Sequence, residues 1–295
     1  MGKRRPHRPV ELLNLPFRGS EAIRDRLLTP DQLSSRVWRK LYYDVYVNVE
    51  IPVDHLLRCR ALSLVLPPRT AVGGRSAACV EGLPIADDRA PVTVLVPSKT
   101  RFRYQGCSVR QTFLPSTFIR PGNPPVRPPV TVPQRTAWEI AGERDLVEAV
   151  AGLDALLHRN YLRDGAMDQW VAASPRARAA RAIALADRRA ESMPESRTRV
   201  RLILAGFPAP VPQHEVWIGG TFAARVDLAW PKAKVAVEYD GAHHAEYGQM
   251  TRDRARLNRL GDAGWTVVHI TAPTLREPLL WDAFLTHLRV APARI

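Results

Sequence analysis

Three carboxylates near the end of the chain stand where two predicted strands finish. Asp227 lies near the end of one β-prone run, and Glu238 directly follows a short apolar run that resembles a buried strand. Asp240 is two residues beyond Glu238 and shares its face if the strand continues. Buried carboxylates need a partner or a cation, and Mg²⁺ prefers oxygen ligands. We therefore predict a Mg²⁺ (or Mn²⁺) site at these acids; the alternative is pairing with basic neighbours at a solvated sheet edge.

The same acids carry a family resemblance. Asp227 followed by Glu238-Tyr239-Asp240 resembles the PD-(D/E)xK nuclease signature in its E-x-D variant. With Gly241 and His244, the pattern is similar to the E-x-D-G-x-x-H of a domain of unknown function related to the very-short-patch-repair (Vsr) endonucleases. The resemblance covers about residues 192–295. Most PD-(D/E)xK enzymes carry a lysine where this chain has Asp240.

This resemblance implies metal-dependent hydrolysis of phosphodiester bonds in DNA. Asp227, Glu238 and Asp240 would hold the metal, and His244 would accept or donate a proton. A helix-flanking histidine hydrogen-bonded to a carboxylate is the alternative for His244. Glu195 has two interpretations of equal weight: a helix cap with Ser192, or a further acid near the metal.

Elements that would position these residues can be predicted from the patterns around them. A helix capped at Ser192 should end at Gly206, and Gly219-Gly220 should turn a hairpin. The predicted order of the C-terminal part is α-β-β-β-α-β-α around a mixed sheet. Arg252 and Arg256 lie on its second helix, where they would contact phosphates or support the site through ion pairs. The predicted strands and later helices span 213–218, 222–228, 235–238, 249–263, 265–271 and 275–288.

The first 50 residues contain a basic arm followed by a helix and a strand pattern. Thr29 caps a helix with Pro30 at its first position, and we expect this helix to continue through residues 37–41. Residues 43–49 alternate as a strand. The segment resembles the reduced winged helix-turn-helix of AbiEi-like antitoxins, which implies DNA binding and a toxin partner. Arg36, Arg39 and Lys40 would face phosphates; a small helical cap with solvated arginines is the alternative.

Domain organisation follows from these patterns. We predict three parts: 1–50, the basic arm and winged-helix-like segment; 51–190, an α/β middle domain with a helical linker; and 191–295, the nuclease-like domain. The motif Thr131-Val132-Pro133-Gln134-Arg135-Thr136 is among those that liken the middle part to AbiEi-like proteins. The predicted fold class is α/β (α+β overall).

Global composition points toward a polyanionic partner. The chain has 295 residues, a formal net charge of +14 and a pI near 10.5. Such a field attracts nucleic acid, although an arginine-rich composition from a GC-rich genome explains part of the excess. Three cysteines without metal spacing favour a reducing cytoplasm. We expect no membrane association, because no apolar run approaches the roughly 18 residues of a membrane span.

Three classes of function are compatible with these features. The first is a metal-dependent endonuclease with an N-terminal DNA-binding region. The second is a DNA-binding, antitoxin-like regulator whose nuclease fold is catalytically idle. The third is a structural or interaction protein whose charge reflects genome composition. The motifs of zinc metalloproteases and P-loop enzymes do not occur in the sequence.

Overall fold

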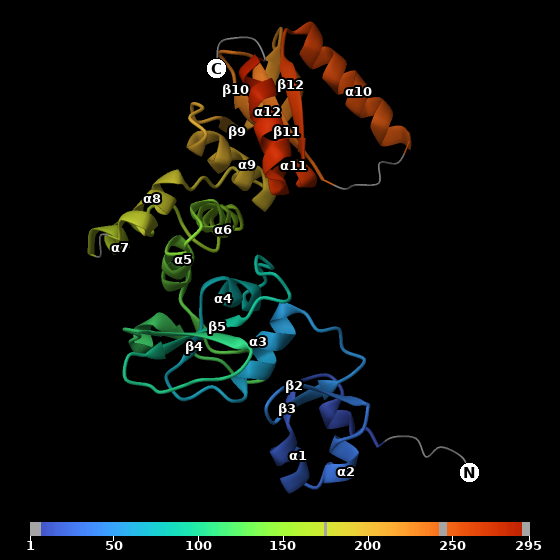
Figure 1. Cartoon of the computed structure of the whole chain (residues 1–295), viewed down its shortest axis with the longest axis vertical. Coiled ribbons are helices and arrows are strands. Elements are labelled where there is room, and N and C mark those ends of the chain that lie inside the picture. The colour runs from blue at the N-terminus through green and yellow to red at the C-terminus, as the bar shows by residue number, and fades with distance from the viewer. Residues whose placement is uncertain (1–6, 174–175, 242–246, 291–295) are drawn as a thin grey trace. The chain divides into compact units, whose positions relative to one another are not determined.

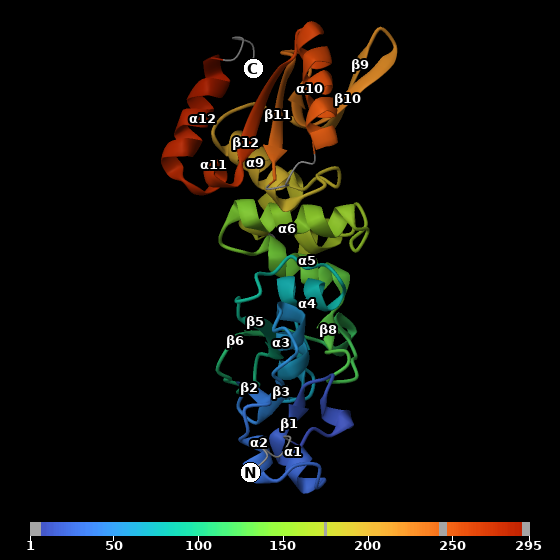
Figure 2. The same cartoon turned by 90° about the vertical axis from the view of Figure 1, so that its right-hand side faces the viewer.

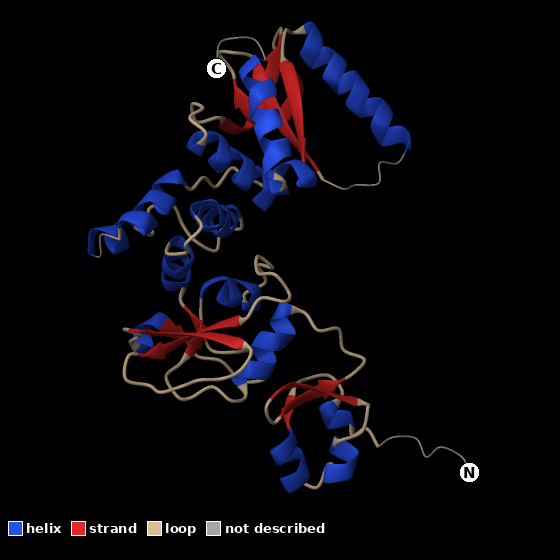
Figure 3. Cartoon of the chain, viewed as in Figure 1, coloured by secondary structure: helices blue, strands red, loops and turns tan. Residues whose placement is uncertain are grey.

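A computed structural model describes residues 7–173, 176–241 and 247–290, with the side chains of all these except 247–254. The chain divides into two compact units, Met1–Ile140 and Ala141–Ile295. Each unit has its own sheets and core (Figure 1). Helices alternate with mixed and antiparallel sheets along the chain, so the predicted α/β class is confirmed (Figure 3).

The first unit begins with a small three-stranded sheet and two short helices. The sheet order is β1-β3-β2, with antiparallel pairing throughout. Thr29 caps α2 through a complete capping box with Gln32, as the sequence predicts. The elements are η1 (Val10–Leu12), β1 (Phe17–Arg18), α1 (Gly19–Arg24), α2 (Pro30–Leu33), β2 (Trp38–Tyr42) and β3 (Val45–Asn48).

The expected continuation of the second helix through residues 37–41 is wrong, because this stretch is strand β2. The hydroxyls of Ser34 and Ser35 donate to carbonyls of the preceding turn, which gives the backbone an alternative to further helix. Trp38 is buried and packs edge-on against Phe17, with ring centroids 5.2 Å apart. Tertiary packing of this indole therefore overrides the local helical pattern.

The rest of the first unit is a five-stranded mixed sheet in the order β6-β5-β4-β8-β7. Its core joins helix α3 to the central strands and includes Leu62, Val94 and Val130. The predicted helices near 54–66 and 75–82 and the strands at 92–96 and 107–110 are confirmed. The elements are α3 (His55–Ser63), β4 (Ala71–Val72), α4 (Gly74–Val80), β5 (Val92–Pro97), β6 (Cys107–Thr112), η2 (Ser116–Phe118), β7 (Ile119–Arg120), β8 (Val130–Thr131) and α5 (Pro133–Ala141).

The second unit opens with helices that were expected in the middle part of the chain. They are α6 (Leu146–His158), α7 (Asp168–Ala173) and α8 (Ala177–Leu185). A buried ion pair connects α6 to α9 (Met193–Leu204): Arg199 Nη2 lies 2.9 Å from Asp154 Oδ2, and the two side chains are 6% and 1% exposed. Asp154 also accepts from the amide of Asp187 at 2.7 Å. This pair fixes α6 against the C-terminal part of the unit.

The C-terminal part confirms the predicted order α-β-β-β-α-β-α, with one short extra helix before the last. Strands β9, β10 and β11 pair antiparallel, whereas β11 and β12 are parallel, in the order β12-β11-β10-β9. Gly219 and Gly220 both have positive φ and turn the β9–β10 hairpin. The elements are α9 (Met193–Leu204), β9 (Val211–Ile218), β10 (Thr221–Trp230), β11 (Val235–Asp240), α10 (Tyr247–Asp262), β12 (Thr266–Thr271), α11 (Ala272–Arg276) and α12 (Pro278–Val290).

Helices cover both faces of this four-stranded sheet (Figure 2). On one face Val237 and Ile270 pack with Leu202 of α9 and with α12. On the other face Ala236 packs with Leu260 of α10. Successive residues of a strand point to opposite faces, so Glu238 lies on the α10 face and Tyr239 on the α9–α12 face. Among the residues described, no helix is long and apolar enough to cross a membrane.

Candidate functional site

Asp227 and Glu238 lie opposite one another on neighbouring strands. The β10–β11 pairing runs from Trp230–Val235 to Leu228–Val237, so the next two residues outward are these acids. The amide of Tyr239 donates to Asp227 Oδ2 at 2.8 Å and fixes the carboxylate at the end of the ladder. The strand pairing therefore brings together the two acids that the sequence placed at the ends of separate strands.

Glu195 approaches the same point from the first turn of α9. Its amide donates to the hydroxyl of Ser192, which in turn donates to Glu195 Oε1 at 2.7 Å. Glu195 Oε2 accepts from the amide of Glu191 at 3.1 Å and from Gln213 Nε2 at 2.8 Å. Both sequence interpretations of Glu195 thus have a structural counterpart: it takes part in the helix cap, and its charge acts on Asp227.

Gln213 is a residue of this site that sequence reasoning missed. It belongs to β9 beside Asp227, since Val226 pairs with His214 and Leu228 with Pro212. Its φ of 51° is left-handed, which is uncommon for a residue other than glycine. Nothing in the local sequence signals that conformation. Its side chain contacts Glu195, which lies 18 positions earlier in the sequence.

The electrostatics of Asp227 distinguish it from an ordinary surface acid. Burial, with a smaller contribution from the nearby carboxylates of Glu195 and Glu238, raises the pKa of Asp227 to about 6. The amide of Tyr239 and the guanidinium of Arg256 act in the opposite direction. Asp227 therefore titrates in a range where acid–base and metal-binding groups operate, which makes it a candidate functional residue.

Arg256 of α10 forms a two-pronged ion pair with Glu238. Its Nη1 lies 2.5 Å from Glu238 Oε1 and its Nη2 lies 2.8 Å from Oε2. The Glu238 side chain is 8% exposed, so the guanidinium supplies the partner that a buried carboxylate requires. Of the two roles predicted for Arg256, the supporting ion pair is present, and phosphate contact stays a prediction.

Asp240 has a different environment from the other acids. Its side chain is 55% exposed and lies 3.1 Å from Nδ1 of His269 on β12. His269 pairs with Glu238 in the parallel β11–β12 register, so it projects on the α10 face beside that acid. Sequence reasoning missed His269; its position in the last strand, in register with the acidic strand, is visible only once the pairing is known.

The fit of a divalent cation follows from the charges of this cluster. No three His, Cys, Asp or Glu side chains within the described ranges are arranged closely enough to hold a metal ion. When ionised, Asp227, Glu238 and Glu195 carry three negative charges, and Arg256 returns one positive charge. Two negative charges remain among these side chains, and carboxylate oxygens are the ligands that a hard divalent ion takes. Asp227 and Glu238 are the residues that would hold it.

Other predicted residues are placed as follows. His244 lies outside the described residues, as does the side chain of Arg252. Arg36 is exposed in the turn after α2. Arg39 and Lys40 are exposed on β2, which is an edge strand, rather than on a helix as expected. The structure therefore presents these three basic side chains on and beside a β-hairpin.

Comparisons with known proteins locate similarity over half of the chain. No protein-family profile matches the sequence. Two proteins of Mycobacterium tuberculosis, from strains CDC 1551 and H37Rv and both described as uncharacterized, are 35% identical over 152 residues. The match covers 50% of this chain and 56% of each relative, so the chain spans about half the length of the proteins it matches.

Proposed function

We propose that the protein is a metal-dependent endonuclease that hydrolyses phosphodiester bonds in DNA through Asp227 and Glu238. The observation that carries the proposal is the coupled carboxylate set on adjacent strands, with the pKa of Asp227 raised to about 6. An excess of two negative charges at a partly buried point is unfavourable in an unloaded protein. A divalent cation removes that excess, and the net charge of +14 attracts the polyanionic substrate.

The residues of the chain have separate tasks in this proposal. Asp227 and Glu238 would hold Mg²⁺ or Mn²⁺, and Asp240 would complete the set directly or through water. When bound, the ion supplies polarisation of a phosphodiester oxygen and a water of lowered pKa. Ser192 and Gln213 hold the carboxylate of Glu195 in place. His244 is the proposed proton acceptor or donor, and His269 holds Asp240.

The test is cleavage of plasmid, linear duplex and single-stranded DNA with Mg²⁺, Mn²⁺ or EDTA. Asp227→Asn keeps the shape and the oxygen that accepts from Tyr239, but it removes the charge. We expect metal-dependent cleavage by the wild type and a loss of about 100-fold in the variant, the upper end of what the loss of a group supporting a metal ligand costs. Glu277→Gln, an exposed acid at the end of α11, is the matched control. Wild-type cleavage in EDTA, or full activity of Asp227→Asn, would refute the assignment.

A DNA-binding, antitoxin-like regulator is the second candidate. The exposed Arg36, Arg39 and Lys40 on and beside the β2–β3 hairpin favour it, because exposed cations close together on one element suit phosphate contacts. A toxin partner belongs to this candidate. Sequence-preferring, salt-sensitive binding without metal-dependent cleavage would support it over the nuclease.

A further inference from the structure

A second candidate site lies on the other face of β11. A cavity of about 370 Å³ opens between α6, α9, β11 and α11, all in the second unit. Its lining includes Arg197, Arg201, Arg276 and Tyr239, and we call it the arginine pocket. The volume falls within the range of small-molecule sites in proteins.

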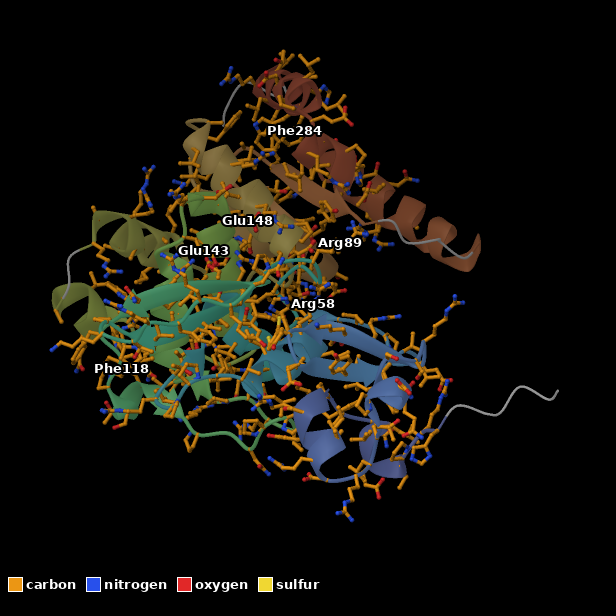
Figure 4. The ribbon with its side chains drawn as sticks, turned by 60° about the horizontal axis from the view of Figure 1, so that its bottom comes forward. Arg58, Arg89, Phe118, Glu143, Glu148 and Phe284 are labelled. Atoms are coloured by element: carbon orange, nitrogen blue, oxygen red, sulfur yellow. The ribbon has the colours of Figure 1, made fainter. Side chains whose placement is uncertain are left out.

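Two of the arginines are held in place with donors to spare. Arg197 Nε and Nη2 lie 2.6 and 3.0 Å from the carboxylate of Glu148, which is labelled in Figure 4. Arg201 donates from one nitrogen to the carbonyl of Leu275, and its guanidinium lies over the Trp281 ring, 5.1 Å from the centroid. A guanidinium has five N–H donors, so each of these side chains retains some for a ligand. Both arginines are therefore preorganised.

Arg276 completes the set from the end of α11. It is exposed, and within the described part of the chain it has no ion pair. Of the two acids in the lining, Glu148 is neutralised by Arg197, and Asp145 caps α6 by accepting from the amides of Val147 and Glu148. Three guanidinium groups against two engaged carboxylates leave a positively charged cavity.

The chemistry of this lining selects the class of ligand. Planar guanidinium forks match the oxygens of a phosphate, and several of them around one cavity favour a dianion over a monoanion. The ring of Tyr239 adds an aromatic surface on which a base can stack. A phosphate that carries a base, as in a nucleotide, matches both features of this lining.

Tyr239 of β11 connects the pocket to the carboxylate site. Tyr239 lines the pocket, and its own amide donates to Asp227. Its neighbours on β11 are Glu238 and Asp240. A ligand in the pocket thus lies at the same end of β11 as the carboxylates, on the opposite face of the sheet.

We propose that the arginine pocket binds the phosphate monoester of a nucleotide, supplied either by the 5′-terminus of a nucleic acid strand or by a free nucleoside monophosphate. The choice of a nucleotide rests on the proposed function; the choice of a phosphate rests on the arginines. Terminal phosphates are distinguished from backbone phosphodiesters by their second negative charge. Arg276 can contact that second charge, and because its side chain is exposed, its substitution should affect folding least.

Fluorescence anisotropy in EDTA tests the proposal without any need for cleavage. The probes are short oligodeoxynucleotides, labelled at the 3′ end, with a 5′-phosphate or a 5′-hydroxyl; dAMP serves as a competitor. We expect the full-length protein to prefer the 5′-phosphate by at least about tenfold, the value of one charge-assisted contact. Arg276→Ala should remove the preference. Arg178→Ala, an exposed arginine of α8 outside the pocket, should keep it.

The outcomes separate the sources and the hypotheses. If dAMP competes but the 5′-phosphate gives no preference, and if Arg276→Ala abolishes the competition, the ligand is the free nucleotide. The proposal would be overturned if the protein showed no 5′-phosphate preference and no competition by dAMP. It would also be overturned if Arg276→Ala and Arg178→Ala behaved alike. Metal-dependent cleavage without phosphate recognition would refute phosphate binding in the pocket but not the nuclease activity. Phosphate recognition without cleavage would refute the nuclease activity but not the pocket.

Discussion

Replacing Asp227 with Asn should make the protein more stable at neutral pH, although it removes a proposed metal ligand. The side chain is partly buried, and the shift of its pKa from 3.8 to about 6 equals about 3 kcal/mol of preference for the neutral form. Residual solvation of the carboxylate reduces this value, so we expect a gain of about 1–3 kcal/mol above pH 6. The amide of asparagine has a similar shape, and its oxygen can still accept from Tyr239.

The sign of the pH dependence follows from linkage. Folded Asp227 binds its proton more tightly than unfolded Asp227, so the contribution of Asp227 to stability falls as the pH rises from about 4 to about 6 and then levels off. Below about pH 4 the acid is neutral in both states, and the advantage of the variant should disappear. Urea denaturation of both proteins in EDTA, at about pH 4 and pH 8, measures the difference.

Two further measurements make this prediction specific. Asp262→Asn, an exposed acid at the end of α10, should show no such pH-dependent gain. Added Mg²⁺ should stabilise the wild type at pH 8 and not Asp227→Asn, since only the former keeps both carboxylates. An equal difference at both pH values, or a variant less stable than the wild type at pH 8, would show that the burial and charge coupling of Asp227 are misjudged.

Other predictions concern paired charges and the basic hairpin. Arg256→Ala should destabilise the protein by about 3–5 kcal/mol in denaturant titrations, because Glu238 remains buried without its partner; Arg256→Lys should recover part of this loss. Asp154→Ala should lower the stability by a similar amount, since it leaves the buried Arg199 without its partner. Substituting both residues with apolar ones should be less destabilising. Arg39→Ala should leave folding intact and reduce the slope of log Kd against log salt for duplex DNA by about 1; an unchanged slope would exclude Arg39 from the interface.

The C-terminal elements could be predicted because their signals are local. Ser192 and Glu195 have capping spacing, Gly219 and Gly220 require a turn, and the apolar runs have the lengths of buried strands. Each of these depends on residues a few positions apart. The site acids could be named for the same reason, since Asp227 and Glu238 lie near the ends of the runs predicted as strands.

The contacts that organise the site were beyond sequence reasoning. The pairing of Arg256 with Glu238 depends on where α10 packs, and that of His269 with Asp240 depends on the parallel register of the last strand. The misassigned stretch 37–41 has the same cause. Its buried indole, Trp38, packs against Phe17, which lies 21 positions earlier. Long-range packing decided each case.

The left-handed backbone of Gln213 sets backbone strain against a hydrogen bond that the site uses. A side chain other than glycine at a φ of 51° costs about 1–2 kcal/mol, and this strain is carried beside the carboxylates. Glycine at this position would relax the chain and remove the amide that Glu195 accepts from, whereas asparagine would keep an amide on a shorter reach. Gln213 is therefore a natural starting point for directed evolution of this protein: selection for thermal tolerance alone should favour glycine, and selection for the chemistry of the site should favour the strained residue.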